Sequence, residues 1–260
     1  MTPPEQSSRR LASLVKKLRA AAPEPAPADE TEVIPGAEGG VQRVIQSLLL
    51  WEASSAQARQ GLRRLREGFV DVNELRVSMA DEIASVLGEK YPLVAERAAR
   101  LRLVLQDVYR RHCAMTLAPL AQLGKREARA VLEGFEGMPV YAAARVSLLE
   151  FGGHGVPCDE RLRALLAREG VLDEATGVEA ASSWLERQVR AEDSLETHRV
   201  LQAWSDEEGA APRRDRRPAP TSSTATAAPA KRPKRRAPSK TKGRGEPAAR
   251  RAGGKTRSGG

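Results

Sequence analysis

The segment that decides the fold of this 260-residue chain runs from Val131 to Asp159 and reads VLEGFEGMPVYAAARVSLLEFGGHGVPCD. A helical pattern ends at a turn that contains Gly134 and Gly137, and a second helical pattern, built from small residues, begins after Pro139. A glycine-rich loop follows, and Asp159 then stands where a further helix would begin. Two helices joined by so short a turn predict a helical hairpin.

The same helical spacing extends on both sides of this hairpin. From Val41 to about Asp206 the apolar residues recur at helical intervals, and neither strand-like alternation nor hairpin-turn dipeptides interrupt them. We therefore predict an all-α fold. A short basic amphipathic helix over residues 8–21 is expected to dock on the core or on a partner. The other expected helices cover residues 41–52, 56–67, 79–87, 92–112, 117–123, 125–133, 139–151, 159–168, 177–189 and 194–204.

Composition divides the chain into three parts. Residues 1–39 hold the short helix and a linker rich in proline, alanine and acids, residues 40–209 hold the helical domain, and residues 210–260 form a tail. The tail contains 16 Lys and Arg residues against two acids, so it carries +14, and residues 1–209 carry the remaining −5 of the total +9. Because the tail has no aromatic or large aliphatic residue, we expect it to be disordered.

Composition also excludes several classes of protein. The chain has no apolar run of eighteen residues and no signal-peptide layout at its N-terminus, so we expect no membrane association and a cytoplasmic location. Its two cysteines, Cys113 and Cys158, are too few for a disulfide framework, a four-thiolate zinc site or an iron–sulfur cluster. The histidines His112, His154 and His198 are scattered singly, so we predict no metal site and no cofactor.

The hairpin segment resembles the helix-hairpin-helix DNA glycosylase superfamily, and endonuclease III in particular. That family reads Leu-Pro-Gly-Val-Gly-x-Lys-Thr-Ala across its hairpin, then Phe-Gly, then an Asp at a helix start. Here FEGMPVYAA over residues 135–143, Phe151-Gly152 and Asp159 fall into the same register without a gap. The segment LLLWEASSAQA over 48–58 and the helical region 84–112 extend the resemblance to about residues 41–204. It implies two helical lobes around a DNA-binding cleft.

The resemblance implies that the hairpin binds a DNA phosphate through backbone N–H groups at a helix start. The residues at that place are Gly137, Val140 and Tyr141, whose N–H groups are expected to point outward. Two changes weaken this binding. Pro139 replaces the second glycine of the family and removes a donor, and Glu136 adds a negative charge.

The resemblance also assigns residues to the reaction. Tyr141 occupies the position of the family's lysine, whose amine forms a Schiff base with the sugar, and a phenol cannot do so. Abasic-site lyase activity is therefore not expected. Asp159 matches the family's carboxylate, which stabilises an oxocarbenium-like sugar and helps to activate water. The alternative is that Asp159 only caps a helix, as an Asp followed by Glu160 would in any protein.

Gln57 has two interpretations. It resembles the polar residue that family members insert into the gap left by a flipped base, whereas a glutamine on a helix surface is usually only solvated. The family's four-cysteine cluster lies beyond its last helix. No cysteine follows Cys158 in this chain, so we expect the iron–sulfur cluster to be absent.

The tail is predicted to bind nucleic acid through its charge. Such cations bind phosphates by releasing counterions, so binding would be sequence-blind and strongly salt-dependent. Residues 40–209 contain 22 basic and 26 acidic residues, so we expect the tail to supply the affinity for double-stranded DNA and to place the protein on the nucleoid. The densest cationic cluster consists of Lys231, Arg232, Lys234, Arg235 and Arg236.

These observations leave three hypotheses. The first is a monofunctional DNA glycosylase of base-excision repair that flips a damaged base into the cleft and uses Asp159. The second is a non-catalytic DNA-binding or scaffolding protein on the same fold, which Glu136, Pro139 and Tyr141 favour. The third is an RNA- or ribosome-associated protein, because a cationic tail does not distinguish RNA from DNA. Neither the damaged base nor the oligomeric state follows from the sequence.

Overall fold

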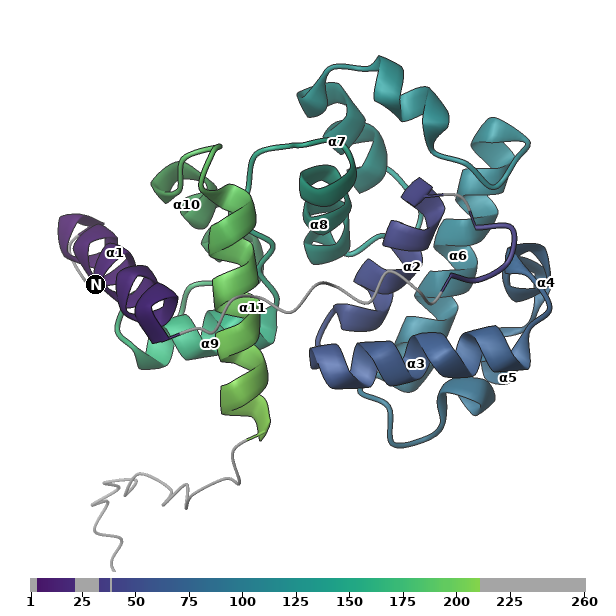
Figure 1. Ribbon diagram of the computed structural model, residues 1–260, viewed down its shortest axis with the longest axis horizontal. Helices are drawn as coiled ribbons and strands as arrows, with labels where there is room; N and C mark the ends of the chain where they lie inside the picture. The colour runs from purple at the N-terminus through teal and green to yellow at the C-terminus, as the bar shows by residue number, and fades with distance from the viewer. Residues whose placement is uncertain (1–3, 22–32, 38, 211–260) are drawn as a thin grey trace, which may run out of the picture. The chain divides into compact units, whose positions relative to one another are not determined.

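The computed structural model describes residues 4–21, 33–37 and 39–210, and every regular element in these ranges is a helix (Figure 1). The prediction of an all-α fold is confirmed. None of the described helices is both long and apolar enough to cross a membrane. The elements are α1 (Pro4–Ala21), α2 (Gly39–Leu50), α3 (Ser55–Gly68), α4 (Val72–Val77), α5 (Ala80–Leu87), α6 (Val94–His112), the 3-10 helix η1 (Ala118–Gln122), α7 (Lys125–Glu133), α8 (Val140–Glu150), α9 (Glu160–Arg168), α10 (Val178–Gln188) and α11 (Ser194–Ala210).

The helices form two lobes, each with its own apolar core, as the resemblance implied. The first lobe consists of α2 to α8, and its core includes the fully buried Leu49, Leu65 and Leu101. The second lobe consists of α1 and α9 to α11, and its core includes Leu166 and Leu201. Two separate cores leave a seam between the lobes, and the candidate site lies along this seam.

Helix α1 packs on the second lobe. Its Leu11 is buried in the same core as Leu166, and three of its other apolar residues pack against that core. Near the end of α1, Arg19 forms an ion pair with Glu196 of α11 at 3.1 Å. The amphipathic helix of the sequence therefore docks on the core, which is one of the two outcomes expected for it.

Helices α7 and α8 form the predicted hairpin, joined by a turn at residues 134–139. Gly137 has a φ of +82°, and a Cβ there would lie 3.1 Å from Cβ of Leu103 on α6, so both conformation and space favour glycine. The three consecutive alanines of α8 allow it to contact α2, α7 and α11 closely. This packing places α8 at the seam, with Tyr141 in its first turn and Arg145 one turn later.

The structure differs from the prediction at four helices. Residues 117–123 form a 3-10 helix over 118–122, α1 begins at Pro4 instead of residue 8, α11 continues to Ala210 instead of ending at Trp204, and helix α4 has no counterpart in the prediction. α4 has six residues and follows the N-cap Asp71, whose side chain accepts the N–H of Glu74 at 2.8 Å. So short a helix lacks the repeated apolar spacing on which the prediction relies. The linker at 22–32 and the tail at 211–260 lie outside the described residues, so the disorder of the tail stays a prediction.

Candidate functional site

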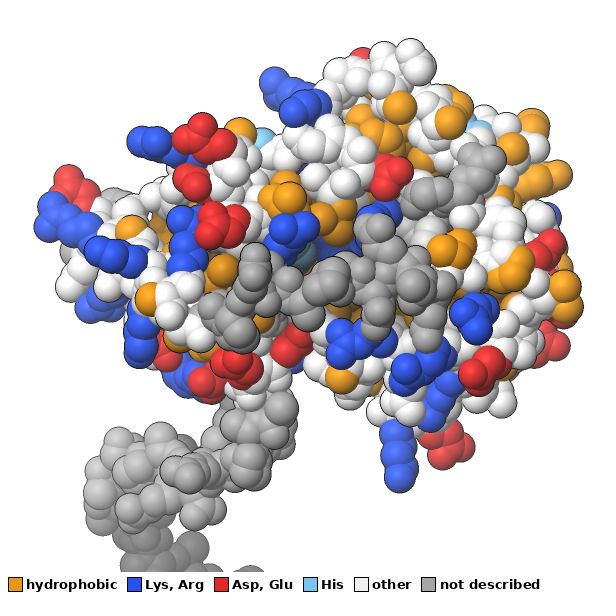
Figure 2. All heavy atoms as spheres, in the orientation of Figure 1, with side chains coloured by type: hydrophobic (Ala, Val, Ile, Leu, Met, Phe, Trp, Pro, Cys, Tyr) orange, Lys and Arg blue, Asp and Glu red, His pale blue; other side chains and the backbone are white. Residues whose placement is uncertain are grey.

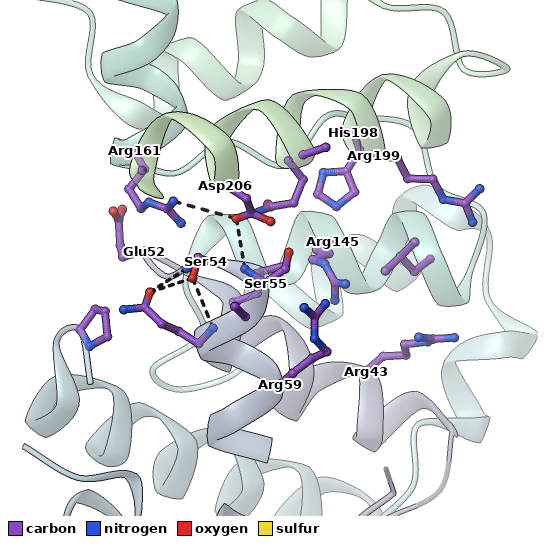
Figure 3. Close-up of a pocket in the computed structure, with 18 of the residues that line it drawn as sticks. Arg43, Glu52, Ser54, Ser55, Arg59, Arg145, Arg161, His198, Arg199 and Asp206 are labelled. Atoms are coloured by element: carbon purple, nitrogen blue, oxygen red, sulfur yellow. Dashed lines mark hydrogen bonds and ion pairs between the residues drawn. The ribbon is translucent and has the colours of Figure 1, made fainter. Parts of the chain in front are cut away.

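A cavity of about 1040 Å³ lies on the seam between the two lobes (Figure 3). Its walls come from α2, the turn that follows α2, the first turns of α3 and α9, the middle of α8 and much of α11. Five arginines against two carboxylates give this cavity a positive lining, although residues 40–209 as a whole are acidic. The ionisable side chains that line it are Arg43, Glu52, Arg59, Arg145, Arg161, His198, Arg199 and Asp206.

The turn after α2 brings a carboxyl group to one end of the cavity. Glu52 has a φ of +54°, a left-handed conformation that residues other than glycine seldom adopt. The buried Arg97 of α6 holds this turn, because its guanidinium donates hydrogen bonds to the carbonyl oxygens of Leu48, Leu49 and Trp51. A helix end leaves such carbonyls without partners, so the arginine caps α2 and fixes the course of the chain at Glu52.

Glu52 and Asp159 are held next to each other by backbone hydrogen bonds across the seam. The N–H of Glu52 donates to Oδ2 of Asp159 at 3.1 Å, and the N–H of Glu160 donates to Oε1 of Glu52 at 2.7 Å. Burial, together with the negative charge of Asp159, raises the pKa of Glu52 to about 7. The Glu52 carboxyl therefore gains and loses its proton closer to neutral pH than an ordinary glutamate does.

Asp159 is the N-cap of α9, as the alternative interpretation of its position expected. Its Oδ1 accepts the N–H of Leu162 at 2.9 Å, while its Oδ2 accepts that of Glu52. Burial raises the pKa of Asp159, although these hydrogen bonds and the charge of Arg161 counteract the shift. The residue is 5% exposed and does not line the cavity, so its carboxylate can act there only through its charge and through Glu52.

Tyr141, which was predicted from the sequence to occupy the position of the family's lysine, is a buried residue that links the lobes. Its hydroxyl donates a hydrogen bond to Oε1 of Gln202 on α11 at 3.0 Å. Its side chain is 3% exposed and does not line the cavity, and burial raises its pKa. Tyr141 therefore offers the cavity neither an amine nor a phenolate.

The hairpin turn directs polar groups into the fold. The N–H of Glu136 donates to Oδ2 of the buried Asp107 at 3.0 Å. The carbonyl oxygen of Gly137 accepts a hydrogen bond from Arg100 at 2.9 Å. The start of α8 still has N–H groups that could bind a ligand. Val140 is half-buried there, and the first N–H groups have no partner within the helix.

Gln57 lies on the cavity wall, but its side chain serves the start of α3. Its Oε1 accepts hydrogen bonds from the N–H and the hydroxyl of Ser54, at 2.9 and 3.1 Å. Its own N–H donates to the Ser54 hydroxyl at 3.3 Å. This capping box favours the local role of Gln57 over insertion into DNA.

No role in the site was predicted from the sequence for several ionisable residues of the cavity, among them Glu52, His198 and Asp206. His198 is 4% exposed, and its burial, with the charges of Arg145 and Arg199, lowers its pKa to about 3, so it is neutral at pH 7. Asp206 accepts a backbone N–H at the start of α3 at 3.1 Å, across the seam. A polar residue at an otherwise apolar position of a helix is the signal that marks His198.

The two cysteines of the chain lie in different surroundings, since Cys113 is exposed and Cys158 is buried. The absence of an iron–sulfur cluster stays a prediction. Within the described ranges, no three His, Cys, Asp or Glu side chains converge to hold a metal ion. The predicted tail contacts lie outside the described residues; they are Lys231, Arg232, Lys234, Arg235 and Arg236.

Solved DNA glycosylases share this fold. A trapped endonuclease III–DNA covalent intermediate is 15% identical, with a TM-score of 0.56 over 78% of this chain and 86% of that one. A thermostable thymine-DNA glycosylase is 14% identical, with a TM-score of 0.50 over 77% of this chain and 87% of that one. The H. pylori 3-methyladenine DNA glycosylase bound to 1,N6-ethenoadenine is 12% identical, with a TM-score of 0.53 over 78% and 98%. No protein-family model and no curated protein matches the chain in sequence. The two helical lobes, the hairpin and these superpositions show that the chain has the helix-hairpin-helix DNA glycosylase fold in a divergent form.

Proposed function

We propose that the chain binds double-stranded DNA and hydrolyses the N-glycosidic bond of a damaged base, as a monofunctional DNA glycosylase of base-excision-repair type. The observation that carries the proposal is the Glu52 carboxyl group at one end of the cavity between the lobes, with the buried carboxylate of Asp159 next to it. Solved structures with the same fold include an endonuclease III–DNA complex and a glycosylase bound to a modified adenine, which supports this class of ligand.

The size of the cavity supports binding of an extruded nucleotide. Pockets for drug-sized ligands occupy roughly 300–1,000 Å³. At about 1040 Å³ the cavity is large enough for a base that has been turned out of the duplex.

Basic side chains along α3 support the approach of DNA to this cavity. Arg59 lies on the wall, and Arg63 and Arg66 follow it at helical spacing on the exposed face. None of the three forms an ion pair with the described residues. Figure 2 shows Lys and Arg side chains gathered on this part of the first lobe. The backbone N–H groups of Gly137, Val140 and Tyr141 and the cationic tail would add phosphate contacts that do not depend on sequence.

In the proposed reaction, Glu52 donates the proton that the departing base takes up. The bond between C1′ and the base nitrogen breaks, and its electron pair leaves with the base, which takes the proton of the Glu52 carboxyl. A water molecule adds to C1′ and gives its proton to the Glu52 carboxylate. The neighbouring Asp159 carboxylate stabilises positive charge at C1′. The reaction ends at an abasic site, because Tyr141 has no amine with which to form a Schiff base.

The test is a strand-release assay of the full-length chain on duplexes that carry single damaged bases or abasic sites, read with and without hot alkali. We expect strand breaks that require alkali, and Glu52→Gln should reduce them by at least about 100-fold. The matched control is Glu160→Gln, because the Glu160 carboxylate is exposed, pairs with Arg163 at 2.6 Å and does not line the cavity. Breaks without alkali would refute the monofunctional reaction, and equal losses in both variants would refute the role of Glu52.

A second candidate function is non-catalytic DNA binding on the same fold. The observation in its favour is that backbone N–H groups occupy both oxygens of Asp159, while Tyr141 is buried. In that case no duplex in the panel loses its base, and salt-sensitive binding disappears when residues 211–260 are removed. Either function would place the protein on the nucleoid.

A further inference from the structure

Away from Glu52, the cavity holds a group of arginines that is not balanced by carboxylates (Figure 3). Arg161 is engaged near Glu52, since it donates to the carbonyl oxygens of Ala53 and Ser205 and lies 4.0 Å from Asp206. Of the remaining arginines, Arg43 lies 3.9 Å from the carboxylate of Glu150 on α8. The other three form no ion pair with the described residues. They are Arg59, Arg145 and Arg199.

Arg145 is the most buried member of this group. Its Nη1 donates to the hydroxyl of Ser47 at 3.0 Å, whereas its Nε is shielded from solvent and has no hydrogen-bond partner among the described residues. Burial lowers the pKa of Arg145, and the like charge of Arg43 lowers it further. A buried guanidinium N–H without an acceptor is costly, and proteins usually satisfy such a group with an ion, a water or a ligand.

The groups around Arg145 favour an anion over any other ligand. Arg43 lies close enough to affect the pKa of Arg145, and Arg145 and Arg199 lie close enough to affect that of His198. His198 is neutral at pH 7, so it adds a hydrogen-bonding ring without adding a negative charge. The Ser47 hydroxyl already donates to the carbonyl oxygen of Arg43 at 2.6 Å, which leaves it as an acceptor for Arg145.

We infer that this part of the cavity binds a phosphate group, with Arg145 as its central ligand. A planar guanidinium presents paired N–H donors that match the oxygens of a phosphate. The inference deepens the proposed function and rests on it for the source of the ligand, which is a backbone phosphate beside the extruded nucleotide. A free mononucleotide carries the same chemistry and is the other possible source.

The first arm of the test uses the full-length chain and inorganic phosphate. Thermal unfolding is followed while phosphate replaces chloride at constant ionic strength. We expect the midpoint to rise by several degrees when phosphate is about 100-fold above its Kd, and Arg145→Met to lose most of this rise. Arg126→Met is the matched control, because Arg126 is exposed on α7, forms no ion pair with the described residues and does not line the cavity.

The results of this first arm can either support or overturn the phosphate site. Equal rises in the wild type and in Arg145→Met, or no rise in either, would overturn the inference. If Arg145→Met does not fold, Arg59→Met serves instead, because Arg59 is exposed on the rim and its loss should reduce the rise by about half.

The second arm identifies the source of the phosphate by fluorescence anisotropy. Its probes are a duplex with one bulged nucleotide, the same duplex with neutral methylphosphonates on both sides of the bulge, and a nucleoside monophosphate. We expect Arg145→Met to weaken binding of the first duplex about 10-fold and to leave binding of the methylphosphonate duplex unchanged. Dependence on Arg145 with the mononucleotide alone would support the site and assign it to free nucleotides, and no dependence with any probe would overturn it. Since neither arm measures base release, the phosphate site and the glycosylase reaction can fail separately.

Discussion

Helix α6 holds two turns of the first lobe with buried charges of opposite sign. Arg97, near the start of the helix, donates hydrogen bonds to carbonyl oxygens at the end of α2. Asp107, near its end, accepts the N–H of Glu136 in the hairpin turn. One charge therefore satisfies acceptors, and the other satisfies a donor.

The two turns differ in what they leave available to a ligand. The turn at Arg97 places Glu52 on the cavity wall, where its pKa rises to about 7. The turn at Asp107 is the one whose sequence resembles the family's hairpin motif, yet the N–H of Glu136 and the carbonyl of Gly137 are bonded inside the fold. The motif by which a fold is recognised and the place where reactive groups remain free can thus be different parts of one molecule.

Arg97→Met should have the largest effect on the stability of these turns. It leaves the carbonyl oxygens of Leu48, Leu49 and Trp51 buried without their donor, which should lower the free energy of unfolding by about 3–5 kcal/mol. Denaturant unfolding at pH 7 measures the loss. The exposed Arg66→Met is the control and should change stability by less than about 0.5 kcal/mol. Similar values for the two variants would show that other contacts hold the turn.

Asp107→Asn should lower stability by less, about 2–3 kcal/mol at pH 7. Burial alone would raise the pKa of Asp107, but hydrogen bonds from the Glu136 N–H, Arg111 and Arg110 outweigh it and hold the pKa below its ordinary value of 3.8. Such a carboxylate adds stability that is complete above the ordinary pKa and is lost as the pH falls through the folded pKa. The difference between the wild type and Asp107→Asn should therefore shrink below about pH 4 in denaturant titrations.

The control for Asp107→Asn is Glu89→Gln, because Glu89 lies exposed on a loop. A stability difference for Asp107→Asn that stays constant from pH 7 to pH 3 would contradict the depressed pKa.

Glu52→Gln should have the smallest effect, and with the opposite sign. Glutamine still accepts the N–H of Glu160 but does not ionise. The pKa of Glu52 rises from 4.5 to about 7 on folding, so the protonated carboxyl stabilises the folded wild type. This contribution is complete below pH 4.5 and is lost as the pH rises through 7. We expect equal stability near pH 4.5 and an advantage of about 1–2 kcal/mol for the variant at pH 8, since solvent in the cavity reduces the full value. A variant that is less stable than the wild type at pH 8 in denaturant unfolding would show that ionisation of Glu52 does not lower the stability of the folded protein.

Most of the helical framework could be predicted because long helices repeat their apolar spacing several times. The predicted bounds of α7, 125–133, are those observed, and α6, α8 and α9 differ from prediction by one or two residues at an end. The short α4 and the 3-10 helix η1 depend on a single cap or turn, for which the spacing gives no signal.

The candidate site was less predictable, because its contacts join segments that are far apart in the chain. The hairpin register leads directly to Asp159 and Tyr141, which the structure buries away from the cavity wall. The contact between Glu52 and Asp159 spans 107 residues, and the contacts of Arg97 with the end of α2 span 46 to 49. Arg97 does carry one local signal, since it shares the buried face of α6 with Leu101.

In evolutionary terms, the hydrogen bond between Tyr141 and Gln202 makes the residue at position 141 hard to exchange. A single step from tyrosine to lysine would remove this link between α8 and α11 and would bury an amine away from the cavity. Opening this position to a ligand would therefore take coordinated changes on both helices.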